Sequence, residues 1–278
     1  MGGTQLRKNG KGGRHMFHDL NGATFNTVSF GTGGLPFVAH GGWTGSWELW
    51  QQPFEVMSTT RRCVSYDHRG TGATVADPSS ITADQMVDDL VSIMDAMDIE
   101  RCILAGESMG GLVTLLAVEH HPERFAGLVL IDAVDTVAPA SVGWLVEGSR
   151  SDYPATVKAF VDACVPEDEV GHIRRWGRQL LMRADPEAAA RLFEGSYGLA
   201  VDLGAITIPS LVIRGSRDAL VSEEASVLMC QSLPDCERHV IDGAGHVPTV
   251  TRSSEVVAII EDWIARRVTT TETPAMLT

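Results

Sequence analysis

The sequence is poor in basic residues and lacks long apolar runs, and both shortages narrow what the protein can be. Its 22 Lys and Arg residues face 36 Asp and Glu residues, which gives a formal net charge of -14. Binding to nucleic-acid phosphates needs a basic surface, so we expect no nucleic-acid partner. No apolar run reaches the ~18 residues that a membrane-spanning helix needs, so we expect no membrane partner either.

Cysteine is also scarce, and its spacing gives no sign of a metal site. The five cysteines are an odd number without metal-ligand spacing, and two of them lie in apolar, strand-like runs. They are Cys63, Cys102, Cys164, Cys230 and Cys236. We expect them to be small buried thiols of a protein in the reducing cytoplasm. We therefore predict neither a metal nor a cofactor.

The alternation of strand-like and helix-like segments predicts one large domain with an insertion. With 278 residues, 44% of them hydrophobic, the chain can bury a sizeable core. Apolar strands alternate with helices over residues 17–133 and again over 209–268, which is typical of a mostly parallel sheet covered on both faces. Residues 134–208 show helical periodicity alone, and we interpret them as a helical lid inserted before the last two strands. Residues 1–16 and 269–278 are expected to be loose tails.

One pentapeptide, Gly-Glu-Ser-Met-Gly at 106–110, predicts a nucleophilic serine. It lies between a short apolar run at 102–105 and a longer one that Pro122 ends, which is the context of a strand-turn-helix nucleophile elbow. Such a turn strains the backbone of the serine and brings the strand close to the helix, so only very small side chains fit on either side. Glycine meets that demand, and Ser108 becomes the candidate nucleophile.

A second loop supplies candidate donors for a developing negative charge. The tetrapeptide His-Gly-Gly-Trp at 40–43 follows a predicted strand, and its backbone N–H groups are candidates for one half of an oxyanion hole. Gly42 is the first choice and Trp43 the second, and the N–H of Met109 would complete the hole. An ordinary tight turn explains the same residues equally well when they are taken alone.

Two more candidates follow the last predicted strands. His246 would take the proton of Ser108, and Asp218 would orient the imidazole and stabilise its charged form. An isolated Asp or His in such a loop is usually structural, but all three at strand ends indicate a site. Asp132 is an alternative acid, because it ends the strand that follows the Ser108 segment.

Four of these features together resemble the alpha/beta-hydrolase family over nearly the whole chain, from about Phe17 to Arg267. They are His40-Gly41-Gly42, Gly106-Glu107-Ser108-Met109-Gly110, Gly215-Ser216-Arg217-Asp218 and Gly245-His246. The resemblance implies the alpha/beta-hydrolase fold and the chain order of nucleophile, acid and base found here. Some family members, including certain zearalenone lactonases and haloalkane dehalogenases, supply the acid from the position of Asp132, but Asp218 fits the commoner arrangement.

Further segments look most like the branch of enol-lactonases, esterases and C–C-bond hydrolases with a small helical lid. These are Tyr66-Asp67-His68-Arg69-Gly70, the stretch from Asp95 to Arg101, and Pro122-Glu123-Arg124. The resemblance implies a serine hydrolase that cleaves a carboxylic ester or a lactone through an acyl-enzyme. C–C-bond hydrolysis, and a small-molecule sensor or receptor on the same fold, are the alternatives. The oligomeric state is not indicated.

Aromatic residues are only 6% of the chain, yet six lie in the inserted segment. They are Trp144, Tyr153, Phe160, Trp176, Phe193 and Tyr197. Some must pack the insertion onto the core, but pockets for uncharged ligands are lined mostly by such groups. With Trp43 and Trp47 beside the oxyanion loop, they predict a medium-sized, largely apolar substrate, such as a macrolactone or an aromatic lactone.

Overall fold

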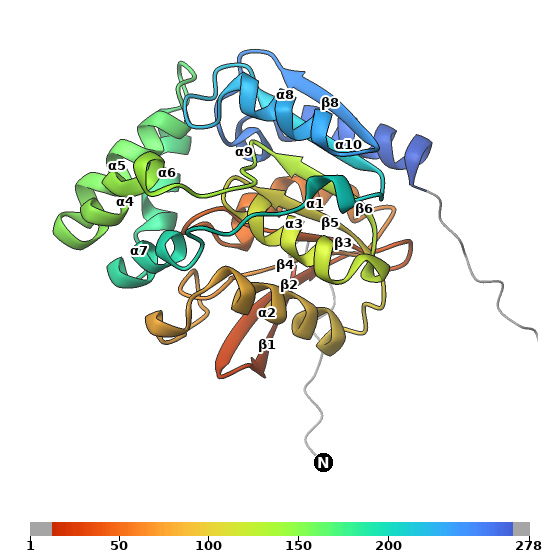
Figure 1. The fold of residues 1–278 in the computed structure, drawn as a ribbon, viewed down its shortest axis with the longest axis horizontal. Helices are drawn as coiled ribbons and strands as arrows, with labels where there is room; N and C mark the ends of the chain where they lie inside the picture. Colours follow the sequence, from red (N-terminus) through yellow and green to blue (C-terminus); the bar gives the residue numbers. More distant parts are fainter. Residues whose placement is uncertain (1–12, 269–278) are drawn as a thin grey trace, which may run out of the picture.

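A computed structural model describes residues 13–268, and an eight-stranded sheet forms its centre (Figure 1). The order in the sheet is β1-β2-β4-β3-β5-β6-β7-β8. The strands are β1 (Arg14–Leu20), β2 (Ala23–Phe30), β3 (Phe37–His40), β4 (Cys63–Tyr66), β5 (Cys102–Glu107), β6 (Phe125–Ile131), β7 (Ser210–Gly215) and β8 (Cys236–Ile241). β1 and β2 pair antiparallel, as do β2 and β4, and all the other pairs are parallel.

Helices cover the sheet on both sides. The α-helices of residues 13–268 are α1 (Gln51–Met57), α2 (Ala83–Ala96), α3 (Gly110–His120), α4 (Pro139–Ser151), α5 (Tyr153–Cys164), α6 (Gly171–Leu181), α7 (Pro186–Glu194), α8 (Glu223–Ser232), α9 (Pro248–Thr251) and α10 (Ser253–Arg267). α2 packs against α3, and α1 packs against α10. The strands between these layers, β3 to β7, are completely buried, which explains their unbroken apolar runs. The predicted fold class is confirmed.

Four helices, α4 to α7, separate β6 from β7 in the chain and gather at one side of the molecule (Figure 1). They occupy the segment predicted to be helical, and their role as a lid stays a prediction. Every helix among residues 13–268 is too short or too polar to cross a lipid bilayer.

The first strand corrects a predicted boundary. Residues up to 16 were expected to form a tail, but β1 begins at Arg14 and pairs with β2 along its length, from Arg14 opposite Ser29 to Leu20 opposite Ala23. The hairpin turn between them has positive φ at Asn21 (48°) and Gly22 (75°), as a two-residue turn of this type requires. The rest of the predicted N-terminal tail, and the C-terminal one, lie outside the described residues.

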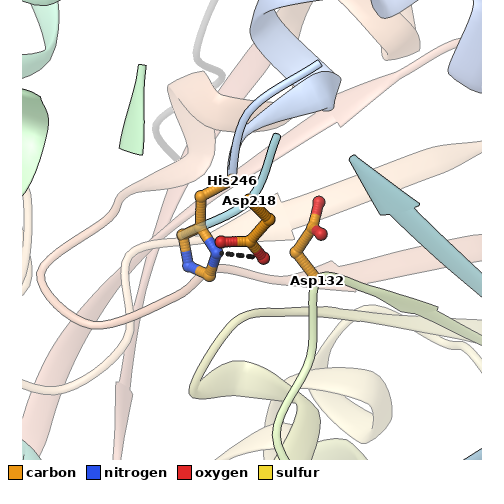
Figure 2. Close-up of side chains that lie close together, drawn as sticks. All are labelled: Asp132, Asp218 and His246. Atoms are coloured by element: carbon orange, nitrogen blue, oxygen red, sulfur yellow. Dashed lines mark hydrogen bonds and ion pairs between the residues drawn. The ribbon is translucent and has the colours of Figure 1, made fainter. Parts of the chain in front are cut away.

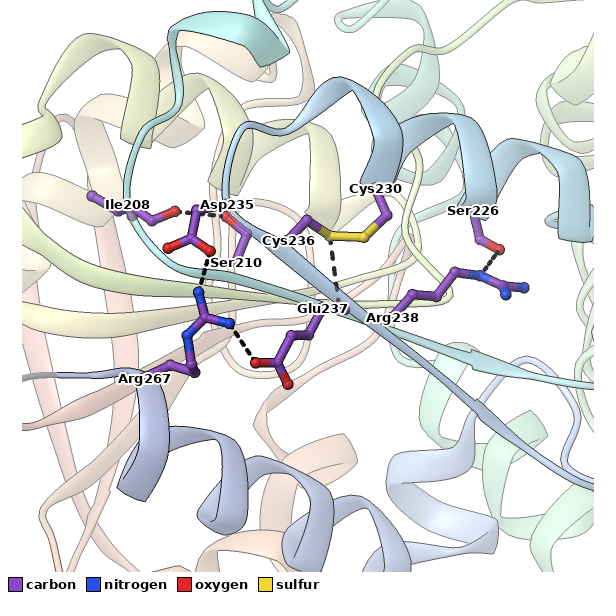
Figure 3. Close-up of a disulfide and its surroundings, with 9 residues drawn as sticks. All are labelled: Ile208, Ser210, Ser226, Cys230, Asp235, Cys236, Glu237, Arg238 and Arg267. Atoms are coloured by element: carbon purple, nitrogen blue, oxygen red, sulfur yellow. Dashed lines mark hydrogen bonds and ion pairs between the residues drawn. A yellow bond between two sulfur atoms is a disulfide. The ribbon is translucent and has the colours of Figure 1, made fainter.

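The cysteines correct a second expectation, because two of the five are not free thiols. Cys230 in the last turn of α8 and Cys236 at the start of β8 form a disulfide, with their Cα atoms 5.5 Å apart (Figure 3). The short connection from α8 to β8 brings the two residues together, which their spacing alone did not reveal. The other three are buried free thiols, and burial raises the pKa of Cys63 to about 12. The free-thiol argument for a cytoplasmic location therefore loses part of its basis.

A buried ion pair joins three segments at the β1–β2–β4 side of the sheet. Arg69, in the loop after β4, donates to both oxygens of Asp89 on α2, at 2.5 and 2.8 Å, and both side chains are at most 2% exposed. The same guanidinium donates to the carbonyl oxygen of Asn21 and to the hydroxyl of Ser80. This one cation therefore joins the β1–β2 turn, the loop after β4 and α2.

We expect Asp89→Asn to lower the free energy of unfolding by about 3 kcal/mol, because it leaves the Arg69 charge buried without its counter-ion. Asp95→Asn, on the same helix, is the matched control: Asp95 pairs with Arg124 but its side chain is 64% exposed. Its loss should cost less than about 1 kcal/mol. Urea unfolding of both variants measures the difference. Equal effects would contradict a stabilising role for the buried pair.

Candidate functional site

The turn that follows β5 holds Ser108 in a strained conformation. Its φ is +55°, in the left-handed region that serine rarely adopts. Three backbone hydrogen bonds fix it: the Ser108 N–H donates to Ile131 O (3.0 Å), and its carbonyl oxygen accepts from Gly111 (2.9 Å) and Val134 (3.1 Å). The turn therefore presents the serine side chain at the end of β5.

The two glycines beside the turn are required by close contacts. A Cβ atom at Gly106 would collide with the side chain of Thr114 on α3. A Cβ atom at Gly110 would collide with the carbonyl oxygen of Gly41, in the loop after β3. The prediction that only very small side chains fit here agrees with this geometry. It also means that α3, β5 and the Gly41 loop pack as one unit.

The structure brings three of the predicted residues into one hydrogen-bonded chain. The Oγ of Ser108 lies 2.8 Å from Nε2 of His246, and Nδ1 of His246 lies 2.9 Å from Oδ2 of Asp218. The imidazole is only 2% exposed and the Asp218 side chain is completely buried. These distances allow His246 to accept the Ser108 proton while Asp218 accepts a hydrogen bond from the opposite side of the ring.

Asp218 is held as a charged acceptor. Its Oδ1 accepts the N–H groups of Leu220 (2.8 Å) and Val221 (3.2 Å). Burial acts to raise the pKa of Asp218, but the charge of His246 and the hydrogen bonds to the carboxylate outweigh burial and lower it. The carboxylate is therefore ionised at neutral pH and stabilises a positive imidazole.

Asp132, the alternative acid, lies beside this chain and does not bond to the imidazole. Figure 2 shows the hydrogen bond of His246 reaching Asp218, while the carboxyl group of Asp132 stands beyond it. The Oδ1 of Asp132 accepts the N–H of Gly215 at 3.0 Å. Asp132, Asp218 and His246 each offer an atom within 4.8 Å of the others, so they could together hold a metal ion. A metal on Nδ1 would replace the bond to Asp218, and the prediction of no metal remains a prediction.

The predicted oxyanion donors lie next to the serine. A Cβ atom at Gly42 would sit 3.0 Å from Cβ of Ser108, so this backbone borders the nucleophile directly. Met109 precedes the first residue of α3, where N–H groups have no partner within the helix. Within residues 13–268, neither the Gly42 N–H nor the Met109 N–H makes a backbone hydrogen bond outside regular helices and strands. Both are therefore available to an oxygen atom beside Ser108.

The side chain of Trp43 packs against the inserted helices, and its backbone N–H as a second oxyanion donor stays a prediction. Its ring is 2% exposed, and its Nε1–H donates to the carbonyl oxygen of Ala189 on α7 at 2.8 Å. The ring also stacks on Phe193, with ring centroids 5.5 Å apart, and meets Phe160 edge-on. Trp43 thus ties the loop after β3 to the inserted helices.

Two supporting residues escaped the sequence analysis. His68 places its Nε2 3.0 Å from the carbonyl oxygen of Gly42 and so supports the oxyanion loop. Burial lowers the pKa of His68, so the ring is neutral at neutral pH. Glu167, after α5, accepts the N–H of Gly245 at 2.8 Å. The sequence signal for His68 was only its place in the turn after β4, and Glu167 had none.

The inserted helices also contact the His246 loop through the main chain. The N–H of His246 donates to the carbonyl oxygen of Cys164, at the end of α5, at 2.8 Å. Arg217, in the Asp218 loop, donates to the carbonyl oxygen of Pro166 at 2.9 Å. The segment after α5 therefore holds the loops that carry both His246 and Asp218.

Glu107, the residue before the nucleophile, is a buried acid close to the site. It is 1% exposed, and its Oε1 accepts the hydroxyl of Thr249 at 2.8 Å. Burial raises the pKa of Glu107 to about 7, although the Thr249 hydrogen bond and the charge of His246 oppose the rise. Its carboxyl group therefore changes charge within the neutral range.

Two cavities meet at Ser108. The first and smaller one has a mainly apolar lining that includes Trp43, Leu49, Val161, Trp176, Leu180 and Val250. The second and larger one also has polar lining residues, among them Asp135, Thr136, Ser141 and Ser222. Ser108, Phe160 and His246 border both cavities. A substrate can therefore place one arm on each side of the serine.

Most of the predicted aromatic residues line these cavities. Trp176 borders the first cavity and Phe160 borders both. Trp144 and Phe193 border the second. Tyr153 and Tyr197 border neither cavity, and Trp47 packs instead against His15 and Phe30, so it does not extend the wall as we expected.

We expect Gly215→Ala to lower the free energy of unfolding by about 1–3 kcal/mol, because its Cβ would collide with the carbonyl oxygen of Gly245 and push the Asp218 and His246 loops apart. Gly143→Ala on α4 is the control, since its Cβ would meet nothing within 4 Å. It should be neutral or stabilise by up to about 1 kcal/mol. Thermal unfolding and the NMR signal of the His246 Nδ1 proton test both loops. An unchanged signal in Gly215→Ala would show that the contact does not position His246.

Comparisons with known proteins identify the family. A profile described as the alpha/beta hydrolase family matches residues 37–259. A Variovorax paradoxus protein, RutD, whose name proposes a carbamate hydrolase activity, is 31% identical over 246 residues, which are 80% of this chain and 88% of that protein. The 2-hydroxymuconate semialdehyde hydrolase of a Pseudomonas species is 24% identical, over 86% of this chain and 90% of that protein.

Solved structures share the fold. The enol-lactonase of Burkholderia xenovorans superposes with a TM-score of 0.85 and 20% identity, covering 90% of this chain and 100% of that one. A thermophilic esterase of Thermogutta terrifontis superposes with a TM-score of 0.83 and 24% identity, covering 92% and 100%. The family profile, the RutD match and the eight-stranded sheet with its strained serine turn all lead to one conclusion: the chain belongs to the alpha/beta hydrolase family.

Proposed function

We propose that this protein is a serine hydrolase that cleaves a carboxylic ester or a lactone through an acyl-enzyme. The observation that carries the proposal is the continuous chain from Ser108 through His246 to the buried, ionised Asp218. Serine is a weak nucleophile at neutral pH, and a base within hydrogen-bond distance is what activates it. Hydrolase is also the activity shared by the names of the relatives.

The proposed reaction has two halves. His246 takes the proton as Ser108 attacks the carbonyl carbon, and it then donates that proton to the leaving oxygen. The N–H groups of Gly42 and Met109 stabilise the oxyanion, and each such donor typically contributes about 3 kcal/mol. Water then repeats the sequence on the acyl-enzyme, with His246 as the base. In this proposal Asp218 is the acid, the indole of Trp43 positions the oxyanion loop, and the backbone N–H of Trp43 is the second choice after Gly42 for the donor from this loop.

The two cavities support a substrate with two arms. We assign the apolar acyl arm to the first cavity, because most of the surface that lines it is apolar. The leaving arm then enters the larger and more polar second cavity. A medium-sized, largely apolar ester or lactone fits this division. The helices α4 to α7, which contribute Phe160 and Trp176, would act as the lid over both arms.

Two other activities use the same residues. The names of the relatives include a proposed carbamate hydrolase, and a carbamate carbonyl offers the same target to Ser108. C–C-bond hydrolysis would need the same nucleophile and oxyanion hole. A sensor or receptor on this fold would bind a ligand without turnover. We keep a cytoplasmic location as part of the proposal, and we make no proposal on the oligomeric state.

We expect a fluorophosphonate probe to label Ser108 and no other serine, because among residues 13–268 Ser108 is the serine whose Oγ is hydrogen-bonded to a histidine. Peptide mass mapping gives the labelled position. Wild-type protein should turn over p-nitrophenyl butyrate, and Ser108→Ala should lose both labelling and turnover. The matching p-nitrophenyl carbamate shows whether carbamates are cleaved as well. Labelling at another residue, or binding without turnover, would reject the proposal in favour of another nucleophile or a receptor.

We expect kcat/KM to rise along a series of p-nitrophenyl esters from acetate to hexanoate. Each CH₂ buried in the first cavity contributes up to about 0.8 kcal/mol of binding, so the rise continues until the cavity is full. The constant leaving group isolates the acyl arm. A steady fall from acetate to hexanoate would contradict the apolar assignment and indicate a small polar substrate.

A further inference from the structure

Asp132 is held firmly beside Asp218, on the side of that carboxylate away from the imidazole. It follows β6 and has a φ of +43°, which asparagine and aspartate tolerate better than most residues. Its N–H donates to the carbonyl oxygen of Ile213 at 2.9 Å, and its Oδ1 accepts from the N–H of Gly215 at 3.0 Å. The side chain is therefore fixed against β7, the strand that leads to Asp218.

The other oxygen of Asp132 has no donor. Oδ2 is buried, and no N–H or O–H group among residues 13–268 donates to it. The neighbouring group is the carboxylate of Asp218, whose own oxygens are acceptors. Asp132 lies on the side of this carboxylate that faces away from the His246 ring (Figure 2). One oxygen of each carboxyl group lies within 4.8 Å of the other. Two buried carboxylates this close repel each other, and a proton on one of them converts the repulsion into a hydrogen bond.

The surrounding charges decide which acid keeps the proton. Burial first, and then the negative charge of Asp218, raise the pKa of Asp132 well above its ordinary value. Glu107 on β5 adds to the rise, and no cation is among the groups that shift this pKa. Arg214, the buried cation of β7, donates to the carbonyl oxygens of Asp218 and Val221.

Asp218 has the opposite environment. Its carboxylate accepts two backbone N–H groups and faces the imidazole of His246, and its pKa is lowered. Cys164 at the end of α5 also faces this cluster, and burial raises the pKa of its thiol, so it adds no charge. The proton therefore belongs to Asp132.

We propose that Asp132 is a neutral carboxylic acid at neutral pH and donates a hydrogen bond from Oδ2 to the carboxylate of Asp218. The proton remains on Asp132 throughout the reaction, and the proton on Nδ1 remains on His246. Asp132 is thus a positioning residue. It fixes the orientation of Asp218 and spreads its charge, which extends the hydrogen-bonded chain from three residues to four.

The kinetic test rests on the proposed hydrolase function. Asp132→Ala removes the donor, and we expect kcat/KM for p-nitrophenyl butyrate to fall about 10- to 100-fold, as for the loss of a hydrogen bond to a charged group. The charge on Asp218 becomes more localised and stabilises the positive imidazole more strongly. The acid limb of the pH profile should therefore move to higher pH by about half a unit.

Asp132→Asn is the conservative variant that separates positioning from acid catalysis. Its amide N–H can donate to Asp218 as the protonated acid does, its oxygen can accept from Gly215, and asparagine tolerates the positive φ. It should recover most of the loss seen in Asp132→Ala and return the acid limb to its wild-type position. Asp218→Asn should lower kcat about 10⁴-fold, because the imidazole loses its partner.

A direct readout does not depend on turnover. Infrared difference spectra at pH 8 between wild-type protein and Asp132→Asn should contain the carbonyl band of one protonated carboxylic acid. The difference between wild type and Glu107→Gln is the control, because Glu107, with a pKa of about 7, is mostly ionised at that pH. The band should therefore be specific to Asp132.

Each outcome decides the proposal. The band in the Asp132→Asn difference, together with rescue by Asn, supports it. Absence of the band, or a loss in Asp132→Asn as large as in Asp218→Asn, overturns it and indicates an ionised Asp132. If no ester is cleaved, the infrared result still tests the proton on Asp132, so this proposal and the proposed function fail separately. If Asp132→Ala does not fold, Asp132→Asn and the spectra remain decisive.

Discussion

The site depends on the left-handed backbone of Ser108. A non-glycine residue in this conformation costs on the order of 1–3 kcal/mol, and the surrounding structure must compensate for it. Hydrogen bonds to the end of β6 and to the segment after it do so, together with the first turn of α3. The close passage of Gly106 and Gly110 past their neighbours leaves the turn no alternative path. The position of Oγ is therefore set by the main chain, and the oxyanion loop is fixed by the same contact.

The acidic side chains buried around this turn differ in their hydrogen-bond partners. Four acids are buried around one histidine: Glu107, Asp132, Glu167 and Asp218. Each has a different partner, namely a hydroxyl, the N–H of Gly215, the N–H of Gly245 and the imidazole. Only the last of these partners can become positively charged. Burial raises the pKa of Glu107 and Asp132, whereas the imidazole and the backbone N–H groups lower the pKa of Asp218, so Asp218 carries the negative charge that the reaction can use.

Sequence patterns predicted the parts of this molecule that depend on local geometry. The buried parallel strands and the Gly-x-Ser-x-Gly turn each follow from short-range rules, so their residues and order could be predicted directly. The choice between Asp132 and Asp218 could not, because both end neighbouring strands and only side-chain direction separates them.

Contacts between segments that are far apart in the sequence could not be predicted either. His68 meets Gly42 through a ring-to-carbonyl contact across two loops, and Glu167 reaches Gly245 from the insertion. The disulfide between Cys230 and Cys236 depended on the angle at which α8 returns to β8. The start of β1 was missed because its first residues, from Arg14, are polar and largely exposed, so they carry no apolar pattern.

The inserted helices are bonded to the core at both sides of the serine. On one side the indole of Trp43 donates to α7, and on the other the carbonyl of Cys164 accepts the main-chain N–H of His246. The inserted segment therefore cannot be replaced without replacing these two hydrogen bonds. An insertion transplanted from a relative would bring its own pocket walls, but it would also have to reproduce an acceptor for the indole and another for the His246 backbone. Substrate range and catalytic geometry are therefore inherited together in this chain, and changes in one constrain changes in the other.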